Sequence, residues 1–232
     1  MRIYAVSKRT TFRISCLSVG WLAWAAVAGA ASIPVANFSF ESPATSEETQ
    51  LIFGNPPSWE LTAGSGGVLR PSFNGGFPGN GYPAAATEGV QFGYANATQR
   101  LRQTVAASPI NFANNTIYTV QVDTAGSAGN STYQIELLDQ LNNVVAASLP
   151  LVATNQVFTP GIFVYSSGVS NPFAGMPLRI SFNITNAAQT VFDNVRLDAV
   201  TIPEPSSYVL LALGISGGIG CARRRRINGK TL

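Results

Sequence analysis

The chain contains no histidine, and its 232 residues include only two cysteines and few charged side chains. Without histidine, neither a serine or cysteine triad with an imidazole base nor a His-ligated zinc site can form. Charged residues make up 11% of the chain, well under the roughly 25% of an ordinary soluble domain. These absences exclude the common His-based enzyme classes.

Charge is segregated along the chain. Residues 1–30 and 206–232 contain basic residues and no acid, whereas residues 31–205 contain five arginines, no lysine and all 11 acids, a net charge of −6. The overall charge of +3 therefore describes the two ends. The middle carries no basic patch for nucleic acid, so we expect no nucleic-acid partner.

The N-terminus has the order of a secretory signal peptide. A basic stretch over 1–13 precedes an apolar run from Ile14 to Ala28, and small residues stand at Ala28 and Ala30. This order predicts a signal peptide over 1–30, cleaved after Ala30. The alternative is an uncleaved N-terminal membrane anchor.

The C-terminus has the order of a membrane segment. Pro203-Glu204-Pro205 precedes an uncharged apolar stretch over 206–222, and four arginines follow: Arg223, Arg224, Arg225 and Arg226. As a helix, 17 residues span roughly 25 Å, just enough to cross a bilayer core. The positive-inside rule places the arginines and a tail over 227–232 in the cytoplasm. A buried helix of the folded domain is the alternative.

The same residues resemble the PEP-CTERM sorting signal of Gram-negative bacteria. The resemblance covers residues 202–226, in which Pro203, Glu204 and Pro205 are the recognition and processing motif. It implies processing by an exosortase and an association with exopolysaccharide. It also implies an inner-membrane-anchored precursor that is later delivered to the cell surface or extracellular matrix.

Residues 31–201 predict one all-β domain. Apolar and polar residues alternate in Tyr118–Asp123, Tyr133–Leu137 and Leu178–Thr185, the habit of antiparallel strands with one wet face. Asn142-Asn143 suits a hairpin turn before a strand over 144–149. No cysteine lies in this range, so no disulfide supports it. We expect an antiparallel β-sandwich of the jelly-roll type, with further strands over 35–40, 50–53, 58–62, 90–95, 100–105, 157–165 and 190–199.

Residues 64–89 combine eight glycines with interleaved prolines and with the aromatics Phe73, Phe77 and Tyr82. This composition predicts a long loop between strands, a kind of segment that often has a function. The three aromatic rings suit stacking on a sugar. The alternative is a covering flap whose rings fill the end of the core.

The domain resembles the galactose-binding-like and carbohydrate-binding-module jelly rolls. The resemblance rests on Asn37–Glu41 with Trp59 at the start, and on Phe192–Leu197 at the end. It implies a structural calcium ion held by Glu41 and Asp193. From the residues alone, Asp193 is two residues from Val191 and from Val195 and four from Leu197, so in a regular strand its side chain points to the same face as theirs. An acid is therefore expected on the core face. A β-bulge that shifts this parity is the alternative.

Catalysis has little support in the sequence. A pair of carboxylates, as in glycoside hydrolysis, is the remaining option, and no spacing selects a pair among Glu41, Glu60, Glu88, Asp123, Glu136, Asp139 and Asp193. We therefore expect a non-catalytic surface or matrix protein with a polysaccharide as its ligand and no certain cofactor. A purely structural or adhesive protein and a secreted glycan-active hydrolase are the alternatives.

Overall fold

The structure is a computed structural model of the chain. It describes residues 30–46, 51–62, 65–71, 81–96, 98–105, 111–186 and 188–203. Residues 1–29 of the predicted signal peptide, with Ala28, lie outside the described residues, as do Glu204, Pro205, the predicted helix over 206–222 and the four arginines. Among the described residues, no helix is long and apolar enough to cross a membrane.

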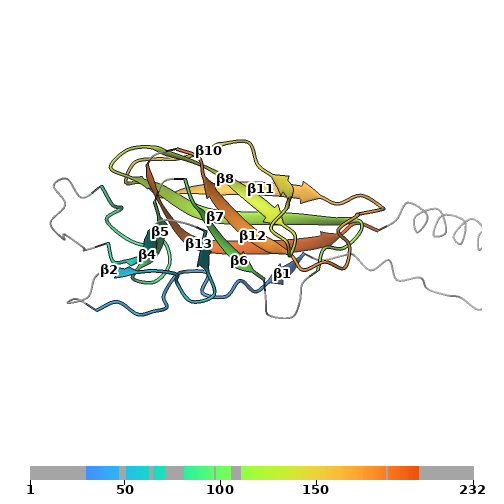
Figure 1. The fold of residues 1–232 in the computed structure, drawn as a ribbon, viewed down its shortest axis with the longest axis horizontal. Coiled ribbons are helices and arrows are strands. Elements are labelled where there is room, and N and C mark those ends of the chain that lie inside the picture. The colour runs from blue at the N-terminus through green and yellow to red at the C-terminus, as the bar shows by residue number, and fades with distance from the viewer. Residues whose placement is uncertain are drawn as a thin grey trace, which may run out of the picture. The chain divides into compact units, whose positions relative to one another are not determined.

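Two antiparallel sheets make up the fold (Figure 1). The seven-stranded sheet has the order β11-β7-β13-β5-β4-β2, with β1 paired to β13, and the six-stranded sheet has the order β10-β8-β12-β6-β3, with β9 paired to β8. This confirms the predicted all-β antiparallel sandwich. The strands are β1 (Ala31–Ile33), β2 (Leu51–Phe53), β3 (Glu60–Leu61), β4 (Gly66–Leu69), β5 (Phe92–Ala95), β6 (Arg100–Thr104), β7 (Thr116–Ser127), β8 (Ser131–Leu138), β9 (Val144–Ala147), β10 (Leu151–Ala153), β11 (Thr159–Ser166), β12 (Arg179–Ile184) and β13 (Gln189–Thr201).

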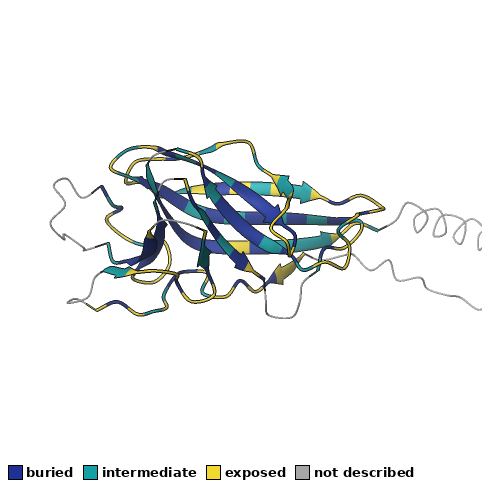
Figure 2. Ribbon diagram, in the orientation of Figure 1, coloured by how far each residue is buried: buried dark blue, intermediate teal, exposed yellow. Residues whose placement is uncertain are grey.

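The core lies between the two sheets (Figure 2). Alternate side chains of β7, such as Val120 and Val122, face alternate side chains of β12, such as Ile180 and Phe182, and all four are fully buried. Four aromatic rings form a continuous stack through this core, with centroids 5.2 Å apart for Phe40 and Trp59, 5.8 Å for Trp59 and Phe182, and 5.0 Å for Phe182 and Phe192. Burial of such large apolar surfaces explains how the domain holds together without a disulfide.

A smaller cluster lies on the other face of the seven-stranded sheet. It contains Leu69, Phe92, Tyr94, Ala125 and Val191, with Tyr82, Ala86 and Phe158 packed against them. Residues 81–91, at the C-terminal end of the glycine-rich segment, cover this face, since Tyr82 and Ala86 pack against the cluster. We call residues 81–91 the flap. The sheet therefore has apolar residues on both faces at this end, which accounts for the fully buried β4 and β5.

The sequence prediction was wrong at several places. Residues 36–39, inside the expected strand 35–40, form a turn, because Phe40 adopts a φ of 56° and its N–H donates to the carbonyl of Asn37. The Asn37 amide secures the turn by donating to the carbonyl of Ser42 at 2.8 Å. Three strands were missed, β1, β4 and β10; each has three or four residues, too few to show a period.

The hairpin between β8 and β9 is present, with Asn142 at a φ of 68° as expected. The turn is longer than the Asn142-Asn143 pair, because it starts at Asp139. The Asp139 carboxylate accepts the N–H groups of Leu141 and Asn143 and the Asn143 amide. These hydrogen bonds lower the pKa of Asp139, and they make its carboxylate part of the turn.

A β-bulge in β13 overturns the predicted parity of Asp193. Register with β7 shifts between Asp193 and Arg196, and Asn194 has a φ of 51°. The bulge places Phe192, Val195 and Leu197 in the sandwich core, while Val191 belongs to the cluster under the flap. Asp193 therefore does not lie on the core face, and its burial comes from the flap.

Candidate binding site

Polar and charged side chains concentrate on the outer face of the six-stranded sheet. Successive side chains of β6, β8 and β12 point to opposite faces of the sheet, and the apolar ones face the core. The outer face carries Arg100, Arg102, Gln134, Glu136, Arg179, Ser181 and Asn183. Glu60 of β3 joins them from the edge. Three of the five arginines in residues 31–205 stand here. In a domain with so few charges, this concentration marks the face as distinct.

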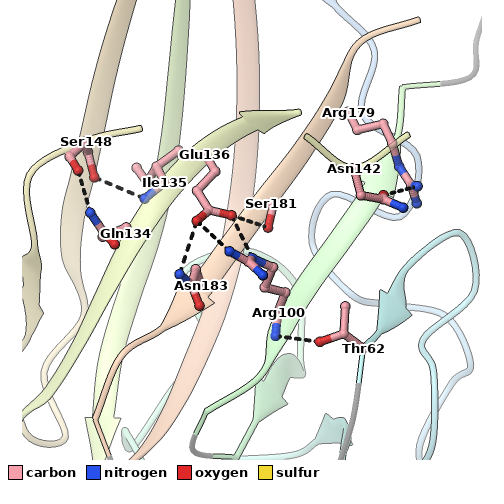
Figure 3. Close-up of polar contacts among 10 residues, drawn as sticks. All are labelled: Thr62, Arg100, Gln134, Ile135, Glu136, Asn142, Ser148, Arg179, Ser181 and Asn183. Carbon is pink, nitrogen blue, oxygen red and sulfur yellow. Dashed lines mark hydrogen bonds and ion pairs between the residues drawn. The ribbon is translucent and has the colours of Figure 1, made fainter. Parts of the chain in front are cut away.

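Glu136 is the centre of this polar face (Figure 3). Its side chain is 4% exposed, and it accepts hydrogen bonds from Arg100 Nε at 2.9 Å and Nη2 at 3.3 Å. Ser181 Oγ and Asn183 Nδ2 each donate at 3.1 Å. A buried carboxylate is tolerated when it is paired and fully hydrogen-bonded. Glu136 meets both conditions, so its position is fixed.

Glu60 is held by two arginines at the edge of the face. Arg102 donates through Nε at 2.9 Å and Nη2 at 2.6 Å, and Arg179 donates through Nη2 at 2.8 Å. The hydrogen bond from Arg102 is the largest cause that lowers the pKa of Glu60, to about 2. Glu60 thus stays ionised at neutral pH, and it cannot serve there as a proton donor.

One hydrogen-bond donor of Arg179 has no partner among the described residues. Its Nη1 contacts the Asn142 amide oxygen, as Figure 3 shows, and its side chain is 13% exposed. Its buried Nε has no hydrogen-bond partner among the described residues. A buried donor without a partner costs free energy, so the Arg179 guanidinium keeps one hydrogen bond unsatisfied at the edge of this face.

Asp193 and Glu41, the predicted calcium ligands, both bind the backbone of the flap. Asp193 Oδ2 accepts the N–H groups of Thr87 at 2.7 Å and Glu88 at 2.9 Å and the Thr87 hydroxyl at 2.9 Å, while Oδ1 accepts the Asn194 N–H at 2.8 Å. Glu41 Oε1 accepts the N–H groups of Val90 and Gln91. The two carboxylates thus fix the flap from two sides.

This donor set does not fit a calcium site at Asp193 as it stands. Both oxygens already face N–H or O–H donors, and a cation would have to displace them. No cluster of three acidic, cysteine or histidine residues lies among the described residues. Calcium at Glu41 and Asp193 stays a prediction, and the hydrogen bonds give the buried carboxylate an alternative means of stabilisation.

Burial changes the proton affinity of Asp193. The side chain is fully buried, and removal from water is the largest cause that raises its pKa from 3.8 to about 6, against the hydrogen bonds from Glu88, Thr87 and Asn194, which lower it. Asp193 therefore takes up a proton at a higher pH than an aspartate in water does.

The aromatics predicted as a ligand platform are only partly described. Phe73 and Phe77 lie outside the described residues. Tyr82 packs on Phe92, with ring centroids 6.4 Å apart, and belongs to the cluster under the flap. For Tyr82, the structure supports the covering-flap interpretation. Of the other sequence candidates, Ala30 is exposed and Pro203 is half-buried at the end of the described chain.

Sequence reasoning missed the arginine–glutamate network. Glu60 and Glu136 were candidates only as members of a carboxylate pair. A usable signal was present, because charged and polar residues alternate with apolar ones in these strands. The polar positions are Arg100, Arg102, Glu136, Arg179 and Asn183. The order of the strands in the sheet, which brings β6, β12 and β8 side by side, could not be read from the pattern.

Comparison with known proteins gives a family. A family model described as HpiC1 cyclase matches residues 31–198, most of the chain. The chain belongs to the HpiC1-like family. A second model, the PEP-CTERM protein-sorting motif, matches residues 201–226 and confirms the sorting signal expected at the C-terminus.

Solved structures of two cyclases are similar to about three quarters of the chain. The Stig cyclase FisC from Fischerella sp. TAU, in complex with (3Z)-3-(1-methyl-2-pyrrolidinylidene)-3H-indole, is 25% identical with a TM-score of 0.62 over 75% of this chain and 100% of that chain. A second cyclase structure from Fischerella sp. TAU is 26% identical, with a TM-score of 0.61 over 76% and 100%.

A carbohydrate-binding module is a more remote neighbour. The CBM22-1 xylan-binding domain of Paenibacillus barcinonensis Xyn10C is 15% identical, with a TM-score of 0.48 over 77% of this chain and 100% of that domain. No curated protein matches the chain.

Proposed function

We propose that the chain is an exported, sorted surface protein that binds a polysaccharide on the outer face of the six-stranded sheet and does not cleave it. The observation that carries the proposal is the fixed network of Glu60, Glu136 and three arginines on one face. The PEP-CTERM motif supports export and sorting. Exosortase is the processing partner, and the membrane holds the precursor.

The polar face matches the hydrogen-bonding needs of a sugar chain. Sugar hydroxyls both donate and accept, and carboxylates, guanidinium groups and amides supply both complements. The Asn183 side chain is half-buried at this face and Arg100 is 41% exposed, so both are within reach of a ligand. Because the network is preorganised by its own salt bridges, little conformational entropy is lost on binding.

The same network argues against hydrolysis. A glycosidase needs one carboxylic acid that keeps its proton and a second carboxylate that stays ionised. Arg102 and Arg179 hold Glu60 ionised, and Glu136 accepts four hydrogen bonds from Arg100, Ser181 and Asn183. Neither acid is placed to give a proton to a glycosidic oxygen.

Retention on immobilised polysaccharides tests the proposal. We expect the full chain to be retarded on at least one neutral polysaccharide in an affinity gel, and Arg179→Gln to reduce the retardation several-fold. Arg196→Gln is the matched control, because Arg196 is exposed on the seven-stranded sheet. Melting of each variant checks that it folds. Failure of every polysaccharide to retard the chain would favour the purely structural or adhesive role.

The family match favours a second candidate, an enzymatic or binding role toward a planar heteroaromatic compound under the flap. Tyr82, Phe92 and Phe158 pack together there, and burial raises the pKa of Tyr94, whose hydroxyl has no partner among the described residues, to about 12. Asp193, with its pKa near 6, is on the same face of β13 as Val191 of this cluster. Its carboxyl group would supply a proton once its hydrogen bonds to the flap backbone open.

The indole compound bound by FisC is the probe for this second role. Quenching of intrinsic fluorescence by the compound, reduced in Tyr94→Phe and in Asp193→Asn but not in Arg179→Gln, would favour it. A compound that leaves the fluorescence and the melting temperature unchanged would contradict it.

A further inference from the structure

One end of the sandwich is an uncharged surface built from three separate segments. The Ser167 N–H donates to the carbonyl of Thr116, the Asn115 N–H donates to the carbonyl of Gly168, and the Ile202 N–H donates to the carbonyl of Asn115. These bonds bring together the start of β7, the loop after β11 and the end of β13. We call residues 111–116, 167–177 and 202–203 the C-terminal pole.

The C-terminal pole exposes apolar side chains and carries no charge. Val169 is 72% exposed, Ile202 39% and Met176 37%. No acidic or basic residue occurs in 105–117 or in 166–178. The pole combines three exposed apolar side chains with the absence of charge, and this combination suits a surface that enters the lipid headgroup layer.

The sorting motif begins where this pole ends. β13 ends at Thr201, and the PEP-CTERM match begins at residue 201. Ile202 is fixed to the domain by its hydrogen bond to Asn115, and the membrane helix predicted from the sequence starts at 206. Four residue steps span at most roughly 14 Å. The headgroup region takes up about 5–7 Å of that distance on each side of the bilayer.

We propose that, in the membrane-held precursor, the C-terminal pole docks on the outer surface of the inner membrane, with Val169, Met176 and Ile202 in the lipid headgroup layer. This inference rests on the proposed export and sorting. The occupant of the surface is the bilayer that the sorting segment itself enters. The short tether, which contains Glu204, brings the pole to the membrane. Because the residues of the pole itself carry no charge, none of them enters the headgroup layer as an ion.

Docking has a consequence for the rest of the domain. β7 runs from the pole to the opposite end over 12 residues, which is roughly 36–40 Å. The loop that follows β10, with Thr154 bound to Gly126, lies at that opposite end. The two ends therefore differ greatly in their distance from the membrane, and labels at each end report the orientation.

The test uses the full chain in lipid nanodiscs that contain a lipid with a spin-labelled headgroup. With Cys16→Ser and Cys221→Ser as background, a fluorophore is attached at Ser170→Cys in the pole or at Thr154→Cys at the opposite end; both positions are exposed. We expect quenching by the labelled lipid to be at least threefold stronger at 170 than at 154. Equal quenching at the two positions would overturn the proposal.

Substitutions that introduce charge into the pole distinguish docking of this surface from simple tethering by the anchor. Val169→Asp together with Met176→Asp should lower the quenching at 170 by half or more, whereas Val157→Asp, exposed at the opposite end, should leave it unchanged. Unchanged quenching in the Asp pair would show that the apolar surface plays no part and would overturn docking. A chain that does not co-elute with the nanodiscs would instead contradict the predicted anchor, and with it the proposed sorting.

Discussion

Asp193 is the residue whose surroundings depart most from those of a surface carboxylate. It is fully buried under the flap, and its burial outweighs the hydrogen bonds from the flap backbone, so its pKa rises from 3.8 to about 6. A raised pKa means that the folded protein binds this proton more tightly than the unfolded chain does. Stability from this residue is thus fully present below about pH 4 and is lost as the pH rises through 6.

Asp193→Asn tests this directly. Between pH 4 and 7 we expect the unfolding free energy of the wild type, measured relative to that of Asp193→Asn, to fall by about 2–3 kcal/mol. Asp198→Asn removes the same charge from a half-buried position of the same strand, and it should keep the wild-type slope. Urea unfolding at several pH values is the measurement. Parallel profiles for the wild type and Asp193→Asn would show that burial does not shift this group.

Glu136 offers a second test at the scale of one residue. Glu136→Gln keeps the shape but turns an amide N–H₂ toward Arg100, Ser181 and Asn183, which are all donors. We expect a loss of about 1–3 kcal/mol in unfolding free energy. Glu88→Gln, an exposed position, should change stability by no more than about 0.5 kcal/mol. Equal losses in the two variants would contradict the view that Glu136 organises the polar face.

At the scale of the elements, the sequence predicted the long strands and several short ones, β2, β3, β5 and β9, but it missed β1, β4 and β10. Tyr118–Asp123 and Leu178–Thr185 show a clear period of two because one face of each strand is wet. β4 and β5 show none, since the flap covers their second face. The bulge after Asp193 depends on Asn194 entering a positive φ, which side-chain alternation does not reveal.

The candidate site was less predictable than the strands. Glu41 and Asp193 were expected together, and the structure does bring both to the flap backbone. The polar face was not expected, because its members come from β3, β6, β8 and β12, and only the pairing of these strands joins them. Contacts between strands distant in sequence are set by topology, and a local pattern cannot give them.

The predicted calcium ligands, Glu41 and Asp193, both contact the flap. If calcium binds Glu41 and Asp193 only in the folded state, a hundredfold excess over Kd stabilises the domain by about 2.7 kcal/mol, which raises the melting temperature by a few degrees. Asp193→Ala should abolish the shift, and a chelator should reverse it. An unchanged melting temperature in millimolar calcium, after prior chelation, would leave the hydrogen bonds of Asp193 and Glu41 as the complete account.

At the scale of the whole molecule, the two ends and the sandwich have different tasks. The basic and apolar ends carry the predicted export signal and the sorting segment, and the acidic sandwich carries the candidate binding faces. The sandwich ends at the residue where the sorting motif begins. Changes in the motif should therefore alter the location of the protein without unfolding the sandwich.

The central claim is that the chain is exported and sorted through its C-terminal motif. The most direct test is the intact mass of the protein released from the surface of its native host, compared with that of Glu204→Ala. The account predicts a wild-type protein that begins at Ala31 and lacks residues from about 206 onward, whereas Glu204→Ala accumulates as a membrane-held precursor with its tail intact. Wild-type protein that keeps both Met1 and Leu232, with the same fractionation as Glu204→Ala, would contradict the claim.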